Sequence, residues 1–303
     1  MTTQDDEGVL DPWVVAWQEE NPLPDWMTEG FPPDIREMAR GDFGGTPALP
    51  MAEVHDEEVD GVGVRIYAHA VPHTGVVVYF HGGAFIVGSV GIMDNVAREL
   101  AHATGAAVVS VGYRLAPEHP YPAGLDDCEA VSRWVAAHTS RFDVPASRVV
   151  LCGESAGGNL ATAVALRLRD AAGPTVAGQV LIYPVTDGPA VTYPSREQFG
   201  RADWVWDEYG GGVDLGGDPY AIPMHATSLA GLPPALVVLA GCDGLRDEGR
   251  AYAAKLRADG VDVDEVCFGG QPHGFINFGF PAAAPAFEHI GRWVRATLAG
   301  APH

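Results

Sequence analysis

Residues 149–170 read VVLCGESAGGNLATAVALRLRD, and this stretch decides the fold class. The apolar run 149–152 predicts a buried strand, and residues 158–171 predict a helix. The five residues between them, GESAG at 153–157, fit the pattern G-x-S-x-G, in which a serine lies on a tight turn from a strand into a helix. The sequence therefore predicts Ser155 as a nucleophile held at the edge of a sheet.

The glycines of this turn have a physical role. A serine on so tight a turn has strained backbone angles, and glycine at positions 153 and 157 removes two Cβ atoms that would collide with the neighbouring strand and helix. The helix that follows points its N-terminal N–H groups at any negative charge formed there. A five-residue pattern with three fixed positions also arises by chance, but its place between a strand and a helix favours the functional interpretation.

Outward from this turn, β-branched runs alternate with helical stretches. This alternation predicts an α/β fold, in which helices cover both faces of a mostly parallel sheet. The expected strands are 62–67, 76–80, 106–111, 149–152, 180–183, 236–240 and 263–268. The expected helices are 93–104, 124–138, 158–171, 247–259 and 283–298.

Two segments depart from this rhythm. Residues 1–50 carry several tryptophans and prolines, with a weak helical stretch around 34–40, and we interpret them as an N-terminal cap segment. Residues 187–224 are rich in Gly, Trp, Asp and Pro and too long for a plain connection, which is typical of a lid or binding loop. We call residues 187–224 the cap insertion and expect a hydrolase domain over 51–303 that contains it.

A serine hydroxyl needs a base and an acid to become a nucleophile. Both are expected later in the chain, in the order serine, acid, histidine. Asp243 follows the apolar run 236–240 and His273 follows the strand 263–268, so both lie at the carboxyl edge of the sheet, where such sites form. Asp247 is the rival acid, but its place at a helix start suits capping, so we prefer Asp243.

A histidine-glycine loop, HGGAF at residues 81–85, follows the strand 76–80. Backbone N–H groups aimed at a developing oxyanion stabilise the transition state of acyl transfer by about 3 kcal/mol per donor. We expect the donors to be the N–H groups of Gly82, Gly83 and Ala156, with His81 in a structural role. The alternative is an ordinary Gly-Gly turn.

These motifs together resemble the hormone-sensitive lipase family, the bacterial family IV esterases. The resemblance rests on the histidine-glycine loop, on GESAGG at 153–158 and on YRLAPEHPYPA at 113–123, and it runs from about residue 62 to 298. It implies an α/β-hydrolase fold with a mostly parallel eight-stranded sheet and a helical cap. Two departures stand out: Gly244 replaces the proline that usually follows the acid, and Ala84 replaces a third glycine.

The resemblance also implies an activity, the hydrolysis of carboxylic esters of short to medium acyl chains through an acyl-enzyme, with neither a metal nor an organic cofactor. A small-molecule ester would then be the partner. The aromatic residues expected near the substrate are Phe85, Tyr183, Phe199, Trp204 and Trp206, although aromatic side chains in such segments are as often core. Two alternatives stay open: hydrolysis of an amide, lactone or biosynthetic intermediate, and a non-catalytic receptor, which the presence of His273 disfavours.

The composition sets further limits. The chain has 303 residues, 40 Asp and Glu against 18 Lys and Arg, and a formal charge of −22, which repels nucleic acid and anionic membranes. The acidic start carries no signal-peptide pattern and no run is long enough to span a bilayer, so we expect a cytoplasmic protein. A homodimer is a hypothesis drawn from relatives. The four cysteines lack metal or redox spacing and are expected to be free core thiols: Cys128, Cys152, Cys242 and Cys267.

Overall fold

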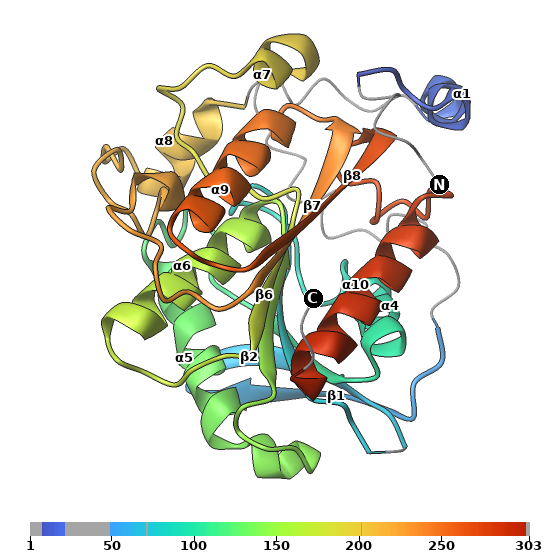
Figure 1. Cartoon of the computed structure of the whole chain (residues 1–303), viewed down its shortest axis with the longest axis vertical. Helices are drawn as coiled ribbons and strands as arrows, with labels where there is room; N and C mark the ends of the chain where they lie inside the picture. Colours follow the sequence, from blue (N-terminus) through green and yellow to red (C-terminus); the bar gives the residue numbers. More distant parts are fainter. Residues whose placement is uncertain (1–7, 22–48, 71, 201, 301–303) are drawn as a thin grey trace.

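One eight-stranded sheet organises the protein (Figure 1). Its strands lie in the order β1-β2-β4-β3-β5-β6-β7-β8. The pairs β1/β2 and β2/β4 are antiparallel, and all later pairs are parallel. The strands are β1 Glu53–Val59, β2 Val62–Ala68, β3 Val76–Phe80, β4 Ala107–Gly112, β5 Val149–Glu154, β6 Gly178–Ile182, β7 Ala235–Cys242 and β8 Val263–Pro272.

The structure is a computed structural model that describes residues 8–21, 49–70, 72–200 and 202–300. Its helices within these ranges are α1 Pro12–Glu20, α4 Asp94–Thr104, α5 Ala123–Ala137, α6 Ala156–Asp170, α7 Pro194–Phe199, α8 Trp204–Gly210, α9 Arg246–Ala258 and α10 Ala283–Ala299. Two short 3-10 helices, η2 Thr139–Phe142 and η3 Pro223–His225, complete them. Among these elements, no helix is both long and apolar enough to cross a membrane.

Helices cover both faces of the sheet (Figure 1). Helices α5, α6 and α9 share one hydrophobic cluster with one face, and α4 and α10 share a second cluster with the other. The central strand β3 shows why: Val76, Val78 and Phe80 point into the first cluster, whereas Val77 and Tyr79 point into the second. Because side chains alternate along a strand, a strand buried on both faces must be apolar throughout.

The predicted α/β-hydrolase fold and its eight-stranded sheet are confirmed. All seven predicted strands and five predicted helices are present with small shifts at their ends. The strand that the pattern missed is β1, whose sequence EVHDEEV is polar and whose side chains are mostly exposed or half-buried. It pairs only with β2 at the edge of the sheet, so it needs no apolar run.

The two predicted cap segments differ in how much the structure describes. The cap insertion contains α7 and α8, ends within η3, and packs beside α6 and α9 (Figure 1). Of the N-terminal segment, the structure describes α1. Just before this helix, the N–H of Asp11 donates a 2.9 Å hydrogen bond to the carbonyl of Gly270 in β8. The helical stretch predicted around residues 34–40 lies outside the described residues.

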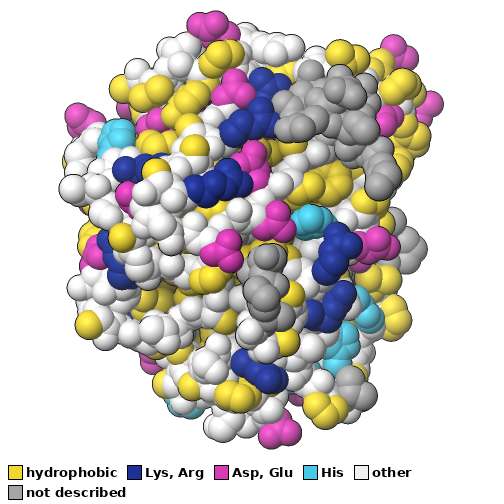
Figure 2. Space-filling model, viewed as in Figure 1, with side chains coloured by type: hydrophobic (Ala, Val, Ile, Leu, Met, Phe, Trp, Pro, Cys, Tyr) yellow, Lys and Arg dark blue, Asp and Glu magenta, His cyan; other side chains and the backbone are white. Residues whose placement is uncertain are grey.

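Charged side chains of both signs are dispersed over the face shown in Figure 2. Most arginines in the described part of the chain make ion pairs, for example Arg65 with Asp56 and Arg141 with Glu57. The formal charge of −22 is therefore not gathered into one acidic patch on this face.

Candidate active site

Ser155 lies on the turn between β5 and α6, as the pattern predicts. Its backbone adopts φ 56° and ψ −119°, a conformation that a residue with a side chain rarely takes. The chain approaches itself closely here. A Cβ at Gly153 would overlap the carbonyl of Gly157, and one at Gly157 would overlap the carbonyl of Phe80. Both glycines are therefore required for the turn to pack against the neighbouring backbone.

The three predicted members of the triad form one chain of hydrogen bonds. The Oγ atom of Ser155 lies 2.9 Å from Nε2 of His273. Nδ1 of His273 lies 2.7 Å from Oδ2 of Asp243. These residues come from the ends of β5, β8 and β7, so three separate strands bring them to one edge of the sheet.

Asp243 is fixed and buried. Only 1% of its side chain is exposed, and its second oxygen, Oδ1, accepts the N–H of Leu245 at 2.9 Å. Burial by itself lowers the pKa of His273, but the nearby Asp243 carboxylate outweighs it, with help from Glu154 and Glu248, so the pKa of the imidazole is raised above its ordinary value. The surroundings of His273 therefore stabilise its imidazolium form.

The rival acid, Asp247, has other partners. Its carboxylate accepts the N–H of Ser195 at 2.9 Å and pairs with Nε of Arg246 at 2.8 Å. Within the described residues, Asp243 and not Asp247 forms the hydrogen bond to His273. The geometry therefore favours Asp243 over Asp247 as the partner of the imidazole.

The histidine-glycine loop corrects one predicted donor. The N–H of Gly82 is already bonded to Oε1 of Glu154 at 2.7 Å, so it is not free to face an oxyanion. In the described part of the chain, the N–H groups of Gly83 and Ala156 donate to no backbone carbonyl. The sequence shows Glu154 beside Ser155, but nothing in the pattern shows that its carboxylate is buried and reaches back to the loop.

His81 is part of the loop's support. Its ring is almost completely buried, stacks on Tyr113 with centroids 4.3 Å apart, and lies within 2.7 Å of the Gly82 carbonyl through Nδ1. The hydroxyl of Tyr113 donates to the carbonyl of His81 at 2.7 Å. Burial lowers the pKa of His81 to about 4, so it is neutral at pH 7.

The aromatic residues predicted near the substrate fall into different environments. Phe85 and Tyr183 are almost completely buried, so in this structure they pack in the core rather than line an open surface. The ring of Tyr183 lies beside that of His273 instead, with centroids 4.9 Å apart. The half-buried Trp204 and Trp206 lie on α8, and Phe199 packs under the guanidinium of Arg246.

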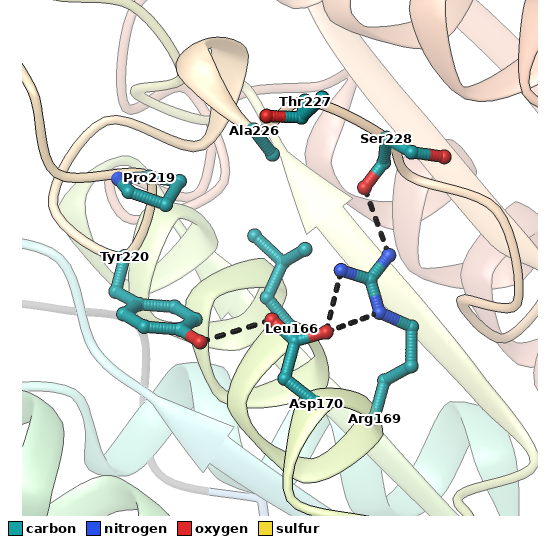
Figure 3. Close-up of a pocket in the computed structure, with 8 residues that line it drawn as sticks. All are labelled: Leu166, Arg169, Asp170, Pro219, Tyr220, Ala226, Thr227 and Ser228. Atoms are coloured by element: carbon teal, nitrogen blue, oxygen red, sulfur yellow. Dashed lines mark hydrogen bonds and ion pairs between the residues drawn. The ribbon is translucent and has the colours of Figure 1, made fainter.

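A surface hollow of about 280 Å³ lies at the far end of α6 from Ser155 (Figure 3). Its polar side chains bond to their neighbours: the Tyr220 hydroxyl donates to Asp170 at 2.9 Å, and Arg169 donates to the Ser228 carbonyl at 2.9 Å. None of the predicted site residues lines it. In the described ranges no group of His, Cys, Asp and Glu side chains is placed to hold a metal ion, and the four cysteines are free.

A mostly parallel sheet covered by helices on both faces, with a serine on a strand-to-helix turn beside a histidine and an aspartate, is the arrangement that defines the α/β hydrolases. The chain belongs to this family: residues 77–277 match the family model described as the alpha/beta hydrolase fold.

Relatives and solved structures agree with this assignment. The chain is 35% identical to esterase LipI of Mycobacterium tuberculosis over 94% of each protein. It is 39% identical to carboxylesterase NlhH of the same organism, over 78% of this chain and 81% of NlhH. Its structure is similar to that of an esterase from Pyrobaculum calidifontis, with a TM-score of 0.84 and 33% identity over 95% of this chain and 98% of the other.

Proposed function

We propose that this protein is a carboxylesterase that uses Ser155, His273 and Asp243 as its catalytic triad. The single observation that carries the proposal is the continuous hydrogen-bonded chain from Ser155 Oγ through His273 to Asp243, with distances of 2.9 and 2.7 Å. The esterase names of its relatives support the choice of carboxylic esters as substrates. Short to medium acyl chains remain a prediction from the sequence.

The proposed cycle has two acyl transfers. Nε2 of His273 takes the proton of the Ser155 hydroxyl as Oγ attacks the ester carbonyl, and the imidazolium then gives that proton to the departing alcohol. Water attacks the acyl-enzyme in the same way: His273 takes its proton, the acid is released and the proton returns to Ser155. Asp243 holds the imidazole in the required tautomer and stabilises its cation.

We propose that the donors to the oxyanion are the N–H groups of Gly83, Ala84 and Ala156. Ala84 replaces Gly82 in this set. The bond from Gly82 to Glu154 supports this change, since it leaves the next amides of the loop as the available donors. Ala84 has φ 55° and lies in a turn that the bond from the Ile86 N–H to the Gly83 carbonyl closes at 2.9 Å. Loss of one such donor costs about 3 kcal/mol of transition-state stabilisation.

The test is an assay of nitrophenyl esters of increasing acyl length beside matching amides, with the variant Ser155→Ala. Ester turnover that vanishes in the variant is the expected result. Full turnover in Ser155→Ala would show that another residue is the nucleophile. Faster hydrolysis of the amides, or of lactones, would favour the alternative acyl substrates, and binding without turnover by the unmodified protein would favour a receptor.

Further proposals concern the cap, the assembly and the location of the protein. We propose that residues 1–50 and the cap insertion together form the cap over a hydrolase domain at 51–303, and that Trp204 and Trp206 of α8 are the aromatic residues nearest the substrate. A homodimer and a cytoplasmic location stay predictions. Sedimentation would test the first, since β8 leaves one edge of the sheet unpaired within the described residues.

A further inference from the structure

Helix α7 of the cap insertion rests directly on the loop that carries the acid. The hydroxyl of Ser195 donates to the carbonyl of Gly244 at 2.8 Å. The N–H of Ser195 donates to Oδ2 of Asp247 at 2.9 Å, and the N–H of Asp247 donates back to Oγ of Ser195 at 3.2 Å. Ser195 is completely buried and so is its bond to Gly244, whereas the two bonds with Asp247 are only partly buried.

The same loop aims the carboxylate of Asp243. Oδ1 accepts the N–H of Leu245 at 2.9 Å, and the backbone carbonyl of Asp243 accepts the N–H of Arg246 at 3.1 Å. The other carboxylate oxygen, Oδ2, faces His273. Gly244 lies between Asp243 and Leu245, so a change in its position moves both the carboxylate and the N–H that holds it.

Glycine at 244 lets the helix come this close. A Cβ at this position would lie 2.5 Å from the carbonyl oxygen of Gly200, at the end of α7, which is too near for any real side chain. Glycine also gives a loop little stiffness of its own. The hydrogen bond from Ser195 therefore restrains the loop at Gly244, where the backbone is otherwise most free to move.

A second contact fixes α7 relative to α9. Arg196, the next residue, is 6% exposed and pairs with the fully buried Glu248, with 2.8 Å between Nε and Oε2. Glu248 also accepts the N–H of Thr186 at 2.9 Å, immediately before the cap insertion. Two sets of contacts therefore fix Ser195 over Gly244: its own bonds to the loop, and the ion pair between Arg196 and Glu248.

We propose that Ser195 is a positioning residue for the hydrolysis, which orients Asp243 through the turn at Gly244 to Asp247. The cap insertion then contributes to the chemical step as well as covering the substrate. This inference rests on the proposed esterase function and assigns a role in it to a residue that touches neither the substrate nor the triad.

The principal test is Ser195→Ala. We expect kcat to fall by about tenfold with KM changed by less than twofold, because a misplaced acid weakens the transition state and not substrate binding. The charged groups that face His273 are Asp243, Glu154 and Glu248. Of these, only Asp243 is positioned by Ser195. A less well-ordered Asp243 should raise the pKa of His273 less and so shift the acidic limb of the pH profile of kcat/KM to lower pH.

Three further variants separate positioning from general stability. Ser195→Thr keeps the hydroxyl and should restore most of the activity. Ser132→Ala is the matched control, because Ser132 is also buried and its hydroxyl also donates to a carbonyl, that of Cys128, but within α5; its pH profile should not move. In the background Asp243→Asn, adding Ser195→Ala should change kcat/KM by less than twofold.

Equal losses from Ser195→Ala with and without Asp243→Asn, or an unchanged acidic limb, would overturn the proposal. A protein without any ester turnover would instead overturn the proposed function. The positioning role would then be tested by proton NMR of the His273 Nδ1–H, whose low-field resonance should weaken or shift in Ser195→Ala and stay unchanged in Ser132→Ala.

Discussion

Glu154 accepts a hydrogen bond of 2.7 Å from the N–H of Gly82 and so ties the residue before the nucleophile to the histidine-glycine loop. The carboxyl group is buried, with 1% of the residue exposed. Burial raises its pKa, while the bond from Gly82 and the charge of His273 act in the opposite direction. Glu154 therefore fixes the loop that carries the proposed oxyanion donors.

Two replacements of Glu154 should show whether its hydrogen bond to Gly82 or its negative charge holds the loop. Glu154→Gln keeps an acceptor for Gly82 and should fold with near-normal stability. Glu154→Leu leaves that buried N–H unpaired and should cost about 1–3 kcal/mol of unfolding free energy, with a larger loss of kcat. Urea unfolding and ester turnover check both variants, and equal stability of the two would show that the bond does not hold the loop.

The two aspartates of the acid loop should differ strongly. Asp243→Asn removes the charge that stabilises the imidazolium and should lower kcat by up to about 10⁴-fold. Asp247→Asn weakens the contact with α7 but leaves the bond between Asp243 and His273 in place, so its loss of kcat should be far smaller. Steady-state kinetics on one nitrophenyl ester decides between them; the reverse ranking would exchange their roles.

The sequence predicts that Ser155 and Asp243 lie at one edge of the sheet because each follows an apolar strand, and His273 follows β8, which is less apolar but pairs with β7 in the same parallel sheet. An apolar run with a polar residue at its carboxyl end is a local pattern, and the parallel sheet then brings the ends together. This explains why Ser155, Asp243 and His273 are found within hydrogen-bonding distance of one another.

Contacts between distant segments are not local patterns, and the sequence missed them. Nothing near Gly82 indicates that Glu154 takes its N–H, and nothing near Ser195 indicates that it binds Gly244. Residue type alone predicts Phe85 and Tyr183 near the substrate, but both are buried, because burial depends on which helices cover them. Strand β1 escaped because an edge strand with polar side chains lacks the apolar signal.

Stability should fall in mild acid because of His81. Its pKa is about 4 in the folded protein and about 6.5 when unfolded, so below pH 6.5 the unfolded chain binds the extra proton and is favoured. The loss grows as the pH falls from 6.5 to 4 and reaches about 3 kcal/mol. Denaturant unfolding at several pH values should show it, and His81→Phe should remove this part of the pH dependence.

The control for His81 is His138→Phe. The ring of His138 also stacks on an aromatic side chain, that of Trp134 with centroids 4.7 Å apart, but it is exposed. This variant should leave the pH dependence of the unfolding free energy unchanged. A wild-type-like slope in His81→Phe would mean that other groups cause the loss in acid.

Tyr209 of α8 should hold the histidine-glycine loop from the side of the cap insertion. Its ring stacks on that of Phe85, with centroids 3.8 Å and planes 12° apart. Ala84 and Phe85 have φ of 55° and 64°, a conformation that non-glycine residues adopt only when packing enforces it. Tyr209→Leu should therefore release the loop and lower kcat by about tenfold, since an aromatic pair contributes about 0.5–1.5 kcal/mol.

The matched variant Tyr209→Phe keeps the stacked ring and removes only the hydroxyl. That hydroxyl is buried and has no hydrogen-bond partner among the residues the structure describes. Its removal should leave turnover unchanged and the unfolding free energy equal or higher, by up to about 1 kcal/mol, because an unpaired polar group costs free energy on burial. If Tyr209→Phe lost as much activity as Tyr209→Leu, the hydroxyl and not the stacked ring would be what the loop requires.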